Sequence, residues 1–446
     1  FFVCFENQKN KKGHLSSLCY DLIAKTNRKE EIQMSLTNSI LCLFEITDPN
    51  LIVTGISKER CSTNQRIHVV HATLSYQLLK CPHCGHKSLI KNGTHMSHLR
   101  LGTLSGGRYE MHLKRQRYQC KDCSKTCGAK TKLVNRNETF THNIKHQVIV
   151  LARDMLTSKE IAKLCGISPS SVQRILNANI HLAYRVKHLP ENLCFDEFRS
   201  CNHWMSFNCC DAVSHRRIVT LKDRLSKDII DYFEARFSVQ ERAQVQSVTI
   251  DMNAEYGSFI HRLFPNAATI IDRFHIIQLA GRALDNERTQ TIRTIQDKHS
   301  RIYHILKSQW RLFHLDEIKV NDSKAVYLRG INEYMTQQNA IDLALDAFPR
   351  FRSVYQTYQG ILSAIHQKDA NAFQSLLTNY QPTSNQMDIT INTFIKNGSA
   401  LLNSCRYPFS NGPIEGLNRK IKALKRNCFG FRNIDNFFIR ISLIHE

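Results

Sequence analysis

The pattern of apolar and polar positions divides the chain into regions of different secondary structure. Between residues 85 and 119, alternating positions such as Tyr109, Met111 and Leu113 predict β-strands. From 144 to 178 the apolar positions recur at helical spacing, and from 190 to 272 short apolar strands alternate with helical stretches. From about 274 to 397 the pattern is helical, with aromatic residues spaced through polar sequence. These changes predict a chain of several domains.

The helical region over 144–178 predicts a helix-turn-helix unit. Ser158 is placed to cap a short second helix, and Gly166 suits a turn with positive φ. Ser168 is placed to cap a third helix, with Pro169 at its first position. An ordinary three-helix packing unit has a similar pattern, so other evidence must support DNA binding.

The third helix has one apolar face and one polar face. The inward apolar residues are Val172, Ile175 and Leu176. The residues left outward, where a recognition helix reads the major groove, are Ser170, Ser171, Gln173 and Arg174. These four residues are the predicted base-reading positions.

The region over 190–272 predicts a mixed sheet in the order βββαβαβ. Three apolar strands end in an acid, at Asp196, Asp251 and Asp272. Two further strands, 203–212 and 217–222, are joined as a hairpin, and helices are expected over 226–237 and 255–263. This order matches a ribonuclease-H-like sheet.

The net charge of the chain indicates which kind of partner it binds. The chain of 446 residues has 61 Lys and Arg against 38 Asp and Glu, a formal net charge of +23. The stretch 81–190 alone holds 19 basic and 5 acidic residues, more than half of that net charge. A polyanion, with nucleic acid first, is the expected partner, and binding should depend strongly on salt.

Composition excludes several classes of protein. Hydrophobic residues make up 42% and charged residues 22%, which is ordinary for a globular protein. No apolar run approaches the ~20 residues that a membrane span needs. No secretory signal is visible, because the run Lys9–Lys12 interrupts the apolar start. We therefore expect an intracellular protein with no membrane partner.

Four of the 16 cysteines have the spacing of a metal site. Cys81 and Cys84 form a CPxCG knuckle, and Cys120 and Cys123 form a second C-x-x-C pair. Four thiolates satisfy tetrahedral zinc and leave no open position, so we predict one structural Zn²⁺. Four reduced cysteines without metal are the alternative, and Cys127 and His86 are expected not to be ligands.

A basic helix is predicted near the end of the chain. Asn411-Gly412-Pro413 predicts a turn and a helix start, and Glu415 falls in the first turn. The residues expected to contact DNA are Asn418, Arg419, Lys420, Lys422, Lys425 and Arg426. A solvated basic face is the alternative. A lone acid among cations is normally a salt-bridge partner, but Glu415 can instead complete a metal cluster.

In their order along the chain, these features resemble a bacterial insertion-sequence transposase of the ISL-three family. The matching motifs are the CPxCG ribbon, the helix-turn-helix, Asp196-Glu197-Phe198, Asp251-Met252-Asn253, Ile271 to His275, and Asn411-Gly412 through Arg419. The resemblance runs from Met34 to the end of the chain.

The resemblance implies a DDE catalytic core on a ribonuclease-H-like fold, with an α-helical insertion before the glutamate. Its catalytic and metal-binding triad is Asp196, Asp251 and Glu415, holding two Mg²⁺ or Mn²⁺ ions. Asp272 is the main rival for the second acid, although Arg273 beside it favours a salt bridge. Asp211 is a weaker rival, and Glu197 is expected on the opposite sheet face.

The resemblance also implies function and location. The protein would bind double-stranded DNA at terminal inverted repeats, cleave it with water, and transfer the freed 3′-OH to target DNA. It would act as a homo-oligomer on DNA, in the bacterial cytoplasm and associated with the nucleoid. A DNA-binding regulator with a decayed catalytic core is one alternative. A ribonuclease-H-like nuclease without strand transfer is another.

The start of the chain has two interpretations. The first methionine is Met34, and Lys29-Glu30-Glu31 corresponds to purine-rich codons of the kind found in a ribosome-binding site. Residues 1–33 are then translated upstream sequence, with Met34 the natural start. A genuine N-terminal extension is the other interpretation.

We therefore expect a multidomain chain of mixed α+β and α/β class. The predicted divisions are 1–33, a non-native or upstream-translated extension; 34–78, an N-terminal segment; 79–135, the zinc ribbon; 140–188, the helix-turn-helix; 190–280, the first part of the core; 281–400, the α-helical insertion; and 401–446, the last part of the core with the Glu415 helix.

Overall fold

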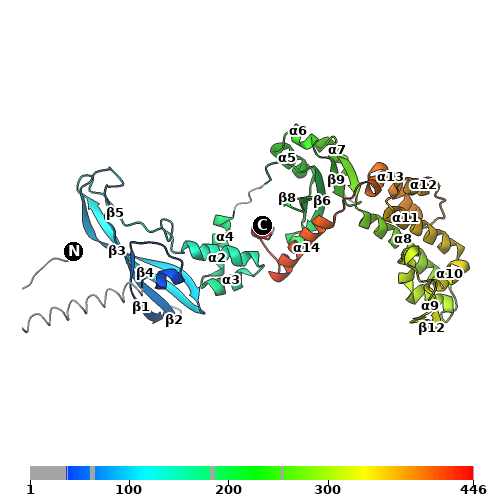
Figure 1. Cartoon of the computed structure of the whole chain (residues 1–446), viewed down its shortest axis with the longest axis horizontal. Helices are drawn as coiled ribbons and strands as arrows, with labels where there is room; N and C mark the ends of the chain where they lie inside the picture. Colours follow the sequence, from blue (N-terminus) through cyan, green and yellow to red (C-terminus); the bar gives the residue numbers. More distant parts are fainter. Residues whose placement is uncertain (1–36, 38, 61–65, 181–185, 253–255, 445–446) are drawn as a thin grey trace, which may run out of the picture.

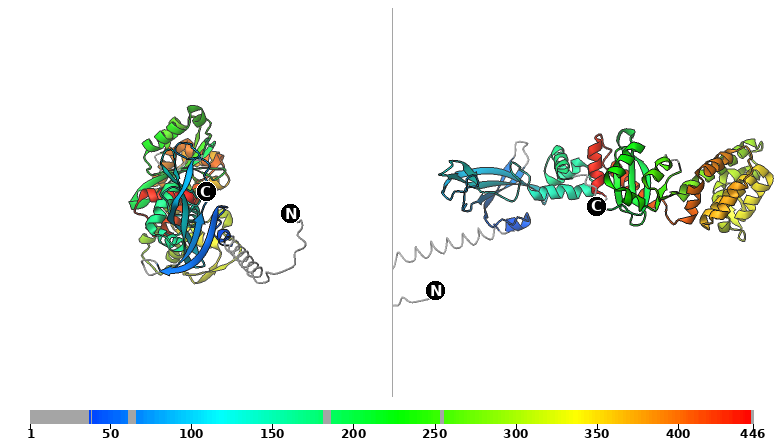
Figure 2. Two further views of the ribbon diagram at one scale, coloured as in Figure 1. Left: turned by 90° about the vertical axis from the view of Figure 1, so that its left-hand side faces the viewer. Right: turned by 90° about the horizontal axis from the view of Figure 1, so that it is seen from above.

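The computed structural model describes residues 37, 39–60, 66–180, 186–252 and 256–444. The molecule is elongated, with a β-rich unit at one end, a small helical unit beside it, a mixed sheet in the centre and a larger helical unit at the other end (Figures 1 and 2). The predicted extension over 1–33 lies outside the described residues, as do Asn253 and Glu255. Among the described helices, none combines the length and apolar character that a membrane crossing needs.

The β-rich unit is one twisted sheet in the order β1-β2-β4-β3, with the short β5 paired to β4. Its strands are β1 (Leu51–Arg60), β2 (Arg66–Leu74), β3 (Leu89–Leu104), β4 (Gly107–Cys120) and β5 (Thr126–Gly128). The predicted zinc ribbon is therefore half of a larger sheet, because the segment 34–78, for which we predicted no structure, supplies β1 and β2. Alternating residues such as Val70, Leu99 and Met111 form its apolar core.

The small helical unit confirms the predicted helix-turn-helix. It consists of α2 (His142–Arg153), α3 (Ser158–Cys165) and α4 (Pro169–Asn179). Gly166 has φ 67°, and the Ser168 side chain caps α4 as expected. The prediction for Ser158 is wrong, because Thr157 caps α3 in a capping box with Glu160.

The last helix among the described residues, α15 (Ile434–Leu443), completes this unit. Its residues Ile439 and Leu443 belong to the apolar cluster of α2, α3 and α4. Arg440 is 1% exposed and donates hydrogen bonds to the carbonyl oxygens of Ala152 and Leu156, at 3.0 and 2.7 Å. Other residues of this helix, Phe438 and Ile441, cluster with Phe198 of the central unit, so the helix joins the two units.

The central sheet has the order β10-β9-β6-β7-β8. Its strands are β6 (Asn192–Arg199), β7 (Met205–Asp211), β8 (Arg217–Leu221), β9 (Ser247–Ile250) and β10 (Ala268–Ile271). β7 is antiparallel to both of its neighbours, β6 and β8, and β9 and β10 run parallel to β6. This is the predicted ribonuclease-H-like sheet, but Asp196 lies within β6 rather than at its end.

Side-chain alternation gives this sheet two different faces. Phe195 and Phe207 point to the face covered by α5 (Ser226–Arg236), the short α6 (Val239–Ala243) and α7 (Gly257–Leu263). Cys194 and Cys210 point to the other face and pack against Ile414 of α14 (Gly412–Asn427). Asp196, two residues after Cys194, therefore faces α14.

The larger helical unit lies between β10 and α14 in the sequence and has its own core. Its helices are α8 (Arg273–Thr294), α9 (Arg301–Ser308), α10 (Gln337–Ala347), α11 (Pro349–His366), α12 (Ala370–Thr378) and α13 (Gln386–Arg406), with a small hairpin of β11 (Val326–Leu328) and β12 (Glu333–Met335) that we did not predict. The helices α8 and α13 each run through a boundary that we drew at 280 or 400, because both continue from the central sheet into the insertion.

Candidate functional site

Three carboxylates form a row across adjacent strands of the central sheet. The register pairs Cys194 of β6 with Thr249 of β9, so Asp196 and Asp251, each two residues further on, lie level. Ile250 pairs with Ile271 of β10, and the backbone N–H of Asp272 donates to the carbonyl of Ile250 at 2.9 Å. Parallel strands thus bring acids from positions far apart in the sequence to one edge.

The start of α14 is tied to each acid of this row. The side-chain amide of Asn411 donates to Oδ1 of Asp251 at 2.7 Å, and its backbone N–H donates to Oδ1 of Asp272 at 3.1 Å. About two turns further along α14, the side-chain amide of Asn418 donates to Oδ2 of Asp196 at 2.6 Å. Glu415 lies between the two asparagines on the same helix, so these bonds fix its position over the sheet edge.

Asn411 shows why this helix start is unusual. Although it is the residue before the helix, its side chain makes no capping bond and points instead to Asp251 and to the carbonyl of Phe195. Its Oδ1 atom is buried without a hydrogen-bond partner. A buried oxygen with no donor, among carboxylates, fits a place beside a cation.

His275 is a member of the site whose role we did not predict. It lies in the first turn of α8, and its Nε2 atom is 3.0 Å from Oδ2 of Asp251. The ligand atoms of Asp272, His275 and Glu415 lie within 4.8 Å of one another. The only sequence signal was its place in the Ile271–His275 motif.

Asp272 does not have the partner that we expected. Arg273 donates instead to the carbonyl oxygens of Ser404, Tyr407 and Pro408 at the end of α13. Asp272 is buried and accepts the backbone N–H of Asn411. The structure therefore places this acid in the cluster, as an anchor for the start of α14.

The other two rival acids have different environments. Glu197 accepts hydrogen bonds from Arg224 and Tyr256, at 2.5 and 3.1 Å, on the opposite face. Asp211 accepts the backbone N–H groups of Val213 and Ser214 in the β7–β8 turn, at 3.0 and 3.2 Å. Both contacts are structural.

Burial, and then the crowding of acids, change the protonation of the cluster. Burial, and then the charge of Asp251, raise the pKa of Asp196 to about 7. Burial also raises the pKa of Asp272, and the hydrogen bond with Asp251 raises the pKa of His275. A cluster of carboxylates that is costly to ionise by itself favours a bound divalent cation.

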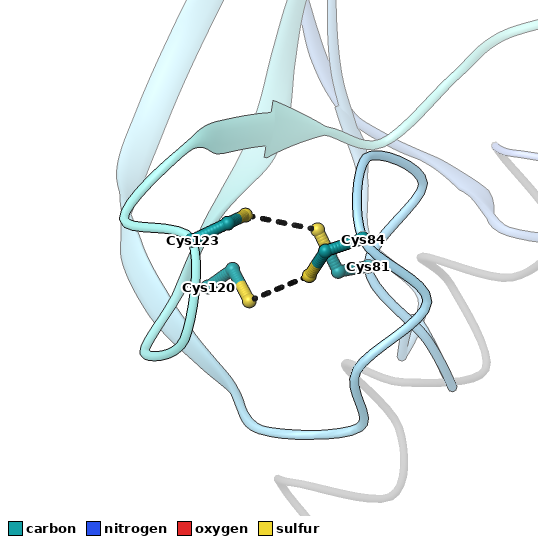
Figure 3. A group of neighbouring side chains, drawn as sticks. All are labelled: Cys81, Cys84, Cys120 and Cys123. Carbon is teal, nitrogen blue, oxygen red and sulfur yellow. Dashed lines mark hydrogen bonds between the residues drawn. The ribbon is translucent and has the colours of Figure 1, made fainter.

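The four predicted zinc ligands meet at one end of the β3–β4 hairpin (Figure 3). The Sγ atoms of Cys81 and Cys123 are 3.7 Å apart, and those of Cys84 and Cys120 are 3.6 Å apart. Positive φ angles at Gly85 and Ser124, 78° and 55°, form the tight turns that the motif predicted. Cys127 and His86 are outside this group, as expected. The arrangement fits one tetrahedral zinc ion.

The predicted base-reading positions on α4 are only partly on the surface. Ser170 and Arg174 are exposed, and Gln173 is half-buried. Ser171 is 5% exposed; its hydroxyl lies 2.9 Å from that of Ser168 and accepts a hydrogen bond from Arg174. The prediction for Ser171 is therefore wrong, because it belongs to the N-terminal cap region of α4.

The predicted DNA-contacting residues of α14 also divide into two groups. The exposed cations are Arg419, Lys420, Lys422 and Arg426. Asn418 is 4% exposed and bonded to Asp196, so its prediction as a DNA contact is wrong. Lys425 donates to the carbonyl oxygens of Arg199 and Ser200, which fixes α14 to the end of β6. Arg419 also pairs with Glu415 at 3.3 Å.

Comparison with known families supports this combination of units. The family profile described as a transposase, for the DDE domain of family ISL3, matches residues 193–441. Two further profiles, described as the helix-turn-helix domain of transposase family ISL3 and the zinc-finger of transposase IS204/IS1001/IS1096/IS1165, match 129–178 and 77–123. Because the first match covers more than half of the chain, this protein belongs to the ISL3 family of transposases. The expected zinc ribbon, helix-turn-helix and DDE core are confirmed.

Two individual proteins are similar to this chain. The transposase for insertion sequence element IS1001 of Bordetella parapertussis is 22% identical over 376 residues, 82% of this chain and 88% of that protein. A Lactococcus lactis protein named ATP-dependent protease is 35% identical over 125 residues, 28% of this chain. The chain matches only 40% of the length of this second protein. The present sequence contains no G-x-x-x-x-G-K-[ST] phosphate-binding loop.

Proposed function

We propose that this chain is a DDE transposase that binds the terminal inverted repeats of its own element, cleaves DNA at the element ends and joins the freed 3′-OH ends to target DNA. The observation that supports it best is the level placement of Asp196 and Asp251 beneath a helix that presents Glu415. Phosphodiester transfer needs this kind of carboxylate cluster because the charges of metal ions must be held beside the reacting phosphate.

In this proposal Asp196, Asp251 and Glu415 hold two Mg²⁺ or Mn²⁺ ions. When bound, the ions activate the attacking oxygen and stabilise the leaving one. Asn418 and Asn411 orient the two aspartates through bonds of 2.6 and 2.7 Å. His275 binds Oδ2 of Asp251 through its Nε2 atom and limits the rotation of that carboxylate.

Asp272 acts in this proposal as the anchor of α14 and not as a ligand. Its carboxylate accepts the backbone N–H of Asn411, which an uncharged amide oxygen can also do. Asp272→Asn therefore separates the two roles. If Asp272 is an anchor, the Asp272→Asn variant still cleaves DNA. If Asp272 is a metal ligand, the variant does not.

The DNA-binding part of the proposal rests on two surfaces. The exposed Ser170 and Arg174 of α4 are offered to the major groove, and the exposed cations of α14 to phosphates beside the acid cluster. Because the reaction acts on two element ends, we propose that the working form is a homo-oligomer that brings one active site to each end.

The test uses purified protein and labelled duplexes that carry the element's own ends, with Mg²⁺ or Mn²⁺. Wild type is compared with Asp196→Ala, Asp251→Ala and Glu415→Ala, and with Asp211→Ala as the matched control in a turn. The expected result is cut and joined DNA with wild type and Asp211→Ala, and binding without cleavage in the three triad variants.

Two results would favour another function. Wild type that binds the ends but cuts with neither metal is a DNA-binding regulator with a decayed core. Wild type that cuts but yields no joined products is a nuclease of the same fold.

A further inference from the structure

One large apolar side chain is almost fully exposed at the junction between the helix-turn-helix and the central unit. Phe429 follows the end of α14 and is 92% exposed. Its backbone φ is 55°, a left-handed value that is unfavourable for a bulky residue. The left-handed φ belongs to the cap that ends α14, and this cap accounts for the backbone but not for an exposed aromatic side chain where glycine is usual.

The loop that carries Phe429 is firmly held. The backbone N–H groups of Phe429 and Gly430 donate to the carbonyl oxygens of Arg426 and Lys425, at 3.0 and 2.8 Å. On one side, the Cys428 thiol lies 3.6 Å from the carbonyl oxygen of Met155 in the helix-turn-helix. On the other, the ring of Phe431 packs on Phe437, with centroids 4.8 Å apart. The exposed ring is thus presented by a fixed scaffold.

An exposed cationic stripe leads from the acid cluster to this ring. Arg419, Lys422 and Arg426 follow Glu415 at intervals of four, three and four residues, so all four residues lie on one face of α14. All three cations are exposed. The 12 positions from Glu415 to Asn427, the last residue of α14, correspond to about 18 Å along the helix. In duplex DNA this is about five base pairs, so the ring just beyond the helix end is expected near the sixth.

We propose that Phe429 inserts into or stacks on a base step of the element-end DNA about six base pairs from the cleaved bond, while the stripe follows the phosphates between them. The proposal rests on the proposed function, because it takes the DNA to lie over Glu415. An aromatic ring stacks on any base, and neighbouring cations bind phosphates, so the site recognises deformable duplex rather than a particular base.

The surroundings of Phe429 favour DNA over a protein partner. The nearest exposed side chains in the sequence include the cations Arg426 and Arg432. In the proposed complex the DNA contacts both α4 and the acid cluster, and the Phe429 loop lies where the helix-turn-helix meets the helix that carries Glu415. These cations attract the phosphates of DNA, whereas a protein partner would need an acidic surface at this place.

The test measures base unstacking without cleavage. Duplexes with the element's ends carry 2-aminopurine at one position each, from two to ten base pairs from the cleaved bond, and Ca²⁺ replaces Mg²⁺. With wild type, fluorescence is expected to rise at one or two adjacent positions near the sixth. Phe429→Ala should abolish this rise and weaken binding about tenfold, as expected for the loss of one base–aromatic stack. Phe429→Trp should keep both.

The matched control is Tyr334→Ala, which removes an aromatic side chain that is 75% exposed in the helical insertion. It should leave fluorescence and binding unchanged. In Mg²⁺, Phe429→Ala should cleave the matched duplex more slowly than wild type. A mismatch at the unstacked position should restore its cleavage, because a mismatched base step opens without the inserted ring.

Three results would overturn the proposal: a failure of wild type to bind the ends, no fluorescence rise with bound wild type, or the same rise in Phe429→Ala. A change only in the oligomeric state of Phe429→Ala would assign the ring to a contact between copies instead. A fluorescence rise without any cleavage in Mg²⁺ would contradict the proposed catalysis and leave the wedge in place.

Discussion

The side-chain amide of Asn418 lies 2.6 Å from Oδ2 of Asp196, a residue 222 positions earlier in the chain. A second buried amide, that of Asn208, holds Asn418 in turn with a hydrogen bond of 3.1 Å to its Oδ1. The Asp196 carboxyl group is thereby oriented by uncharged amide donors. A cation placed at this edge of the sheet would therefore meet an oriented ligand.

Replacement of Asn418 by Ala should weaken metal binding. The orientation of Asp196 is lost, so the Mg²⁺ concentration for half-maximal cleavage should rise by about 10- to 100-fold. Titration of cleavage with Mg²⁺ measures this shift. The control is Asn427→Ala at the exposed end of the same helix, which should behave as wild type. Equal Mg²⁺ requirements in Asn418→Ala and wild type would exclude this role.

Asp196 should make the metal-free protein less stable as pH rises. Its pKa is about 7 in the folded chain against an ordinary value of 3.8, so the folded state holds a proton that the unfolded state has released. The free energy of unfolding therefore falls between about pH 4 and pH 7 and stays low above it. Asp196→Asn should exceed wild type by up to about 4 kcal/mol at pH 8 and match it at pH 4.

Urea unfolding in buffer without Mg²⁺ or chelator, so that zinc is retained, measures both values. Addition of Mg²⁺ at pH 8 should stabilise wild type and not the variant, because only wild type keeps the full set of carboxylates. A wild type that gains stability relative to Asp196→Asn between pH 5 and pH 8 would contradict the assigned direction.

One zinc ion should be bound for each chain and lost with any one of its four ligands. Cys84→Ser leaves three thiolates and should release the metal, whereas Cys127→Ser, a neighbouring cysteine outside the group, should keep it. Zinc content measured in reductant separates the two variants. Zinc loss in Cys127→Ser as well would mean that the ligand set is wrong.

Replacement of Arg174 should affect DNA recognition, whereas replacement of Ser171 should affect stability, although both residues lie on α4. Arg174 is exposed, so Arg174→Ala should weaken binding of the inverted repeat by about 1–3 kcal/mol and reduce its preference over unrelated DNA. Ser171 is buried in the cap region, so Ser171→Ala should cost about 1 kcal/mol of stability and leave sequence preference unchanged. Competition binding at fixed salt tests both, and a change of preference in Ser171→Ala would reverse this assignment.

Arg440 should stabilise the helix-turn-helix from the far end of the chain. Arg440→Met keeps most of the volume but leaves the carbonyl oxygens of Ala152 and Leu156 without a donor. The loss should be about 2–4 kcal/mol of unfolding free energy, with faster proteolysis between 142 and 180. Ser442→Ala on the same helix is the control and should change little.

The sequence predicted individual strands and helices better than the pairing of distant strands. Strand-then-acid patterns located β9 and β10, and the spacing of apolar residues located α4, because both depend on neighbours in the chain. The pairing of β1 and β2 with the zinc-binding hairpin was missed, although alternation is present in 51–74. A parallel contact between β2 and β4 joins strands that no turn connects, so a local pattern does not reveal it.

The site shows the same limit more sharply. Asp251 and Glu415 were indicated by a strand end and a helix start, which are positions visible in sequence. Asn418 appeared to be one polar residue on a basic helix, and His275 one histidine among 21. Their roles depend on where α14 and α8 meet the sheet, which tertiary packing alone determines.

The position of α15 also affects the order in which a growing chain becomes competent. Ile439 and Leu443 fill the core of three helices that the ribosome makes some 260 residues earlier. Until those last residues emerge, the DNA-reading unit lacks part of its interior. A polypeptide that ended before α15 would therefore lack a complete DNA-binding domain, and it would compete poorly with full-length copies for the element's ends.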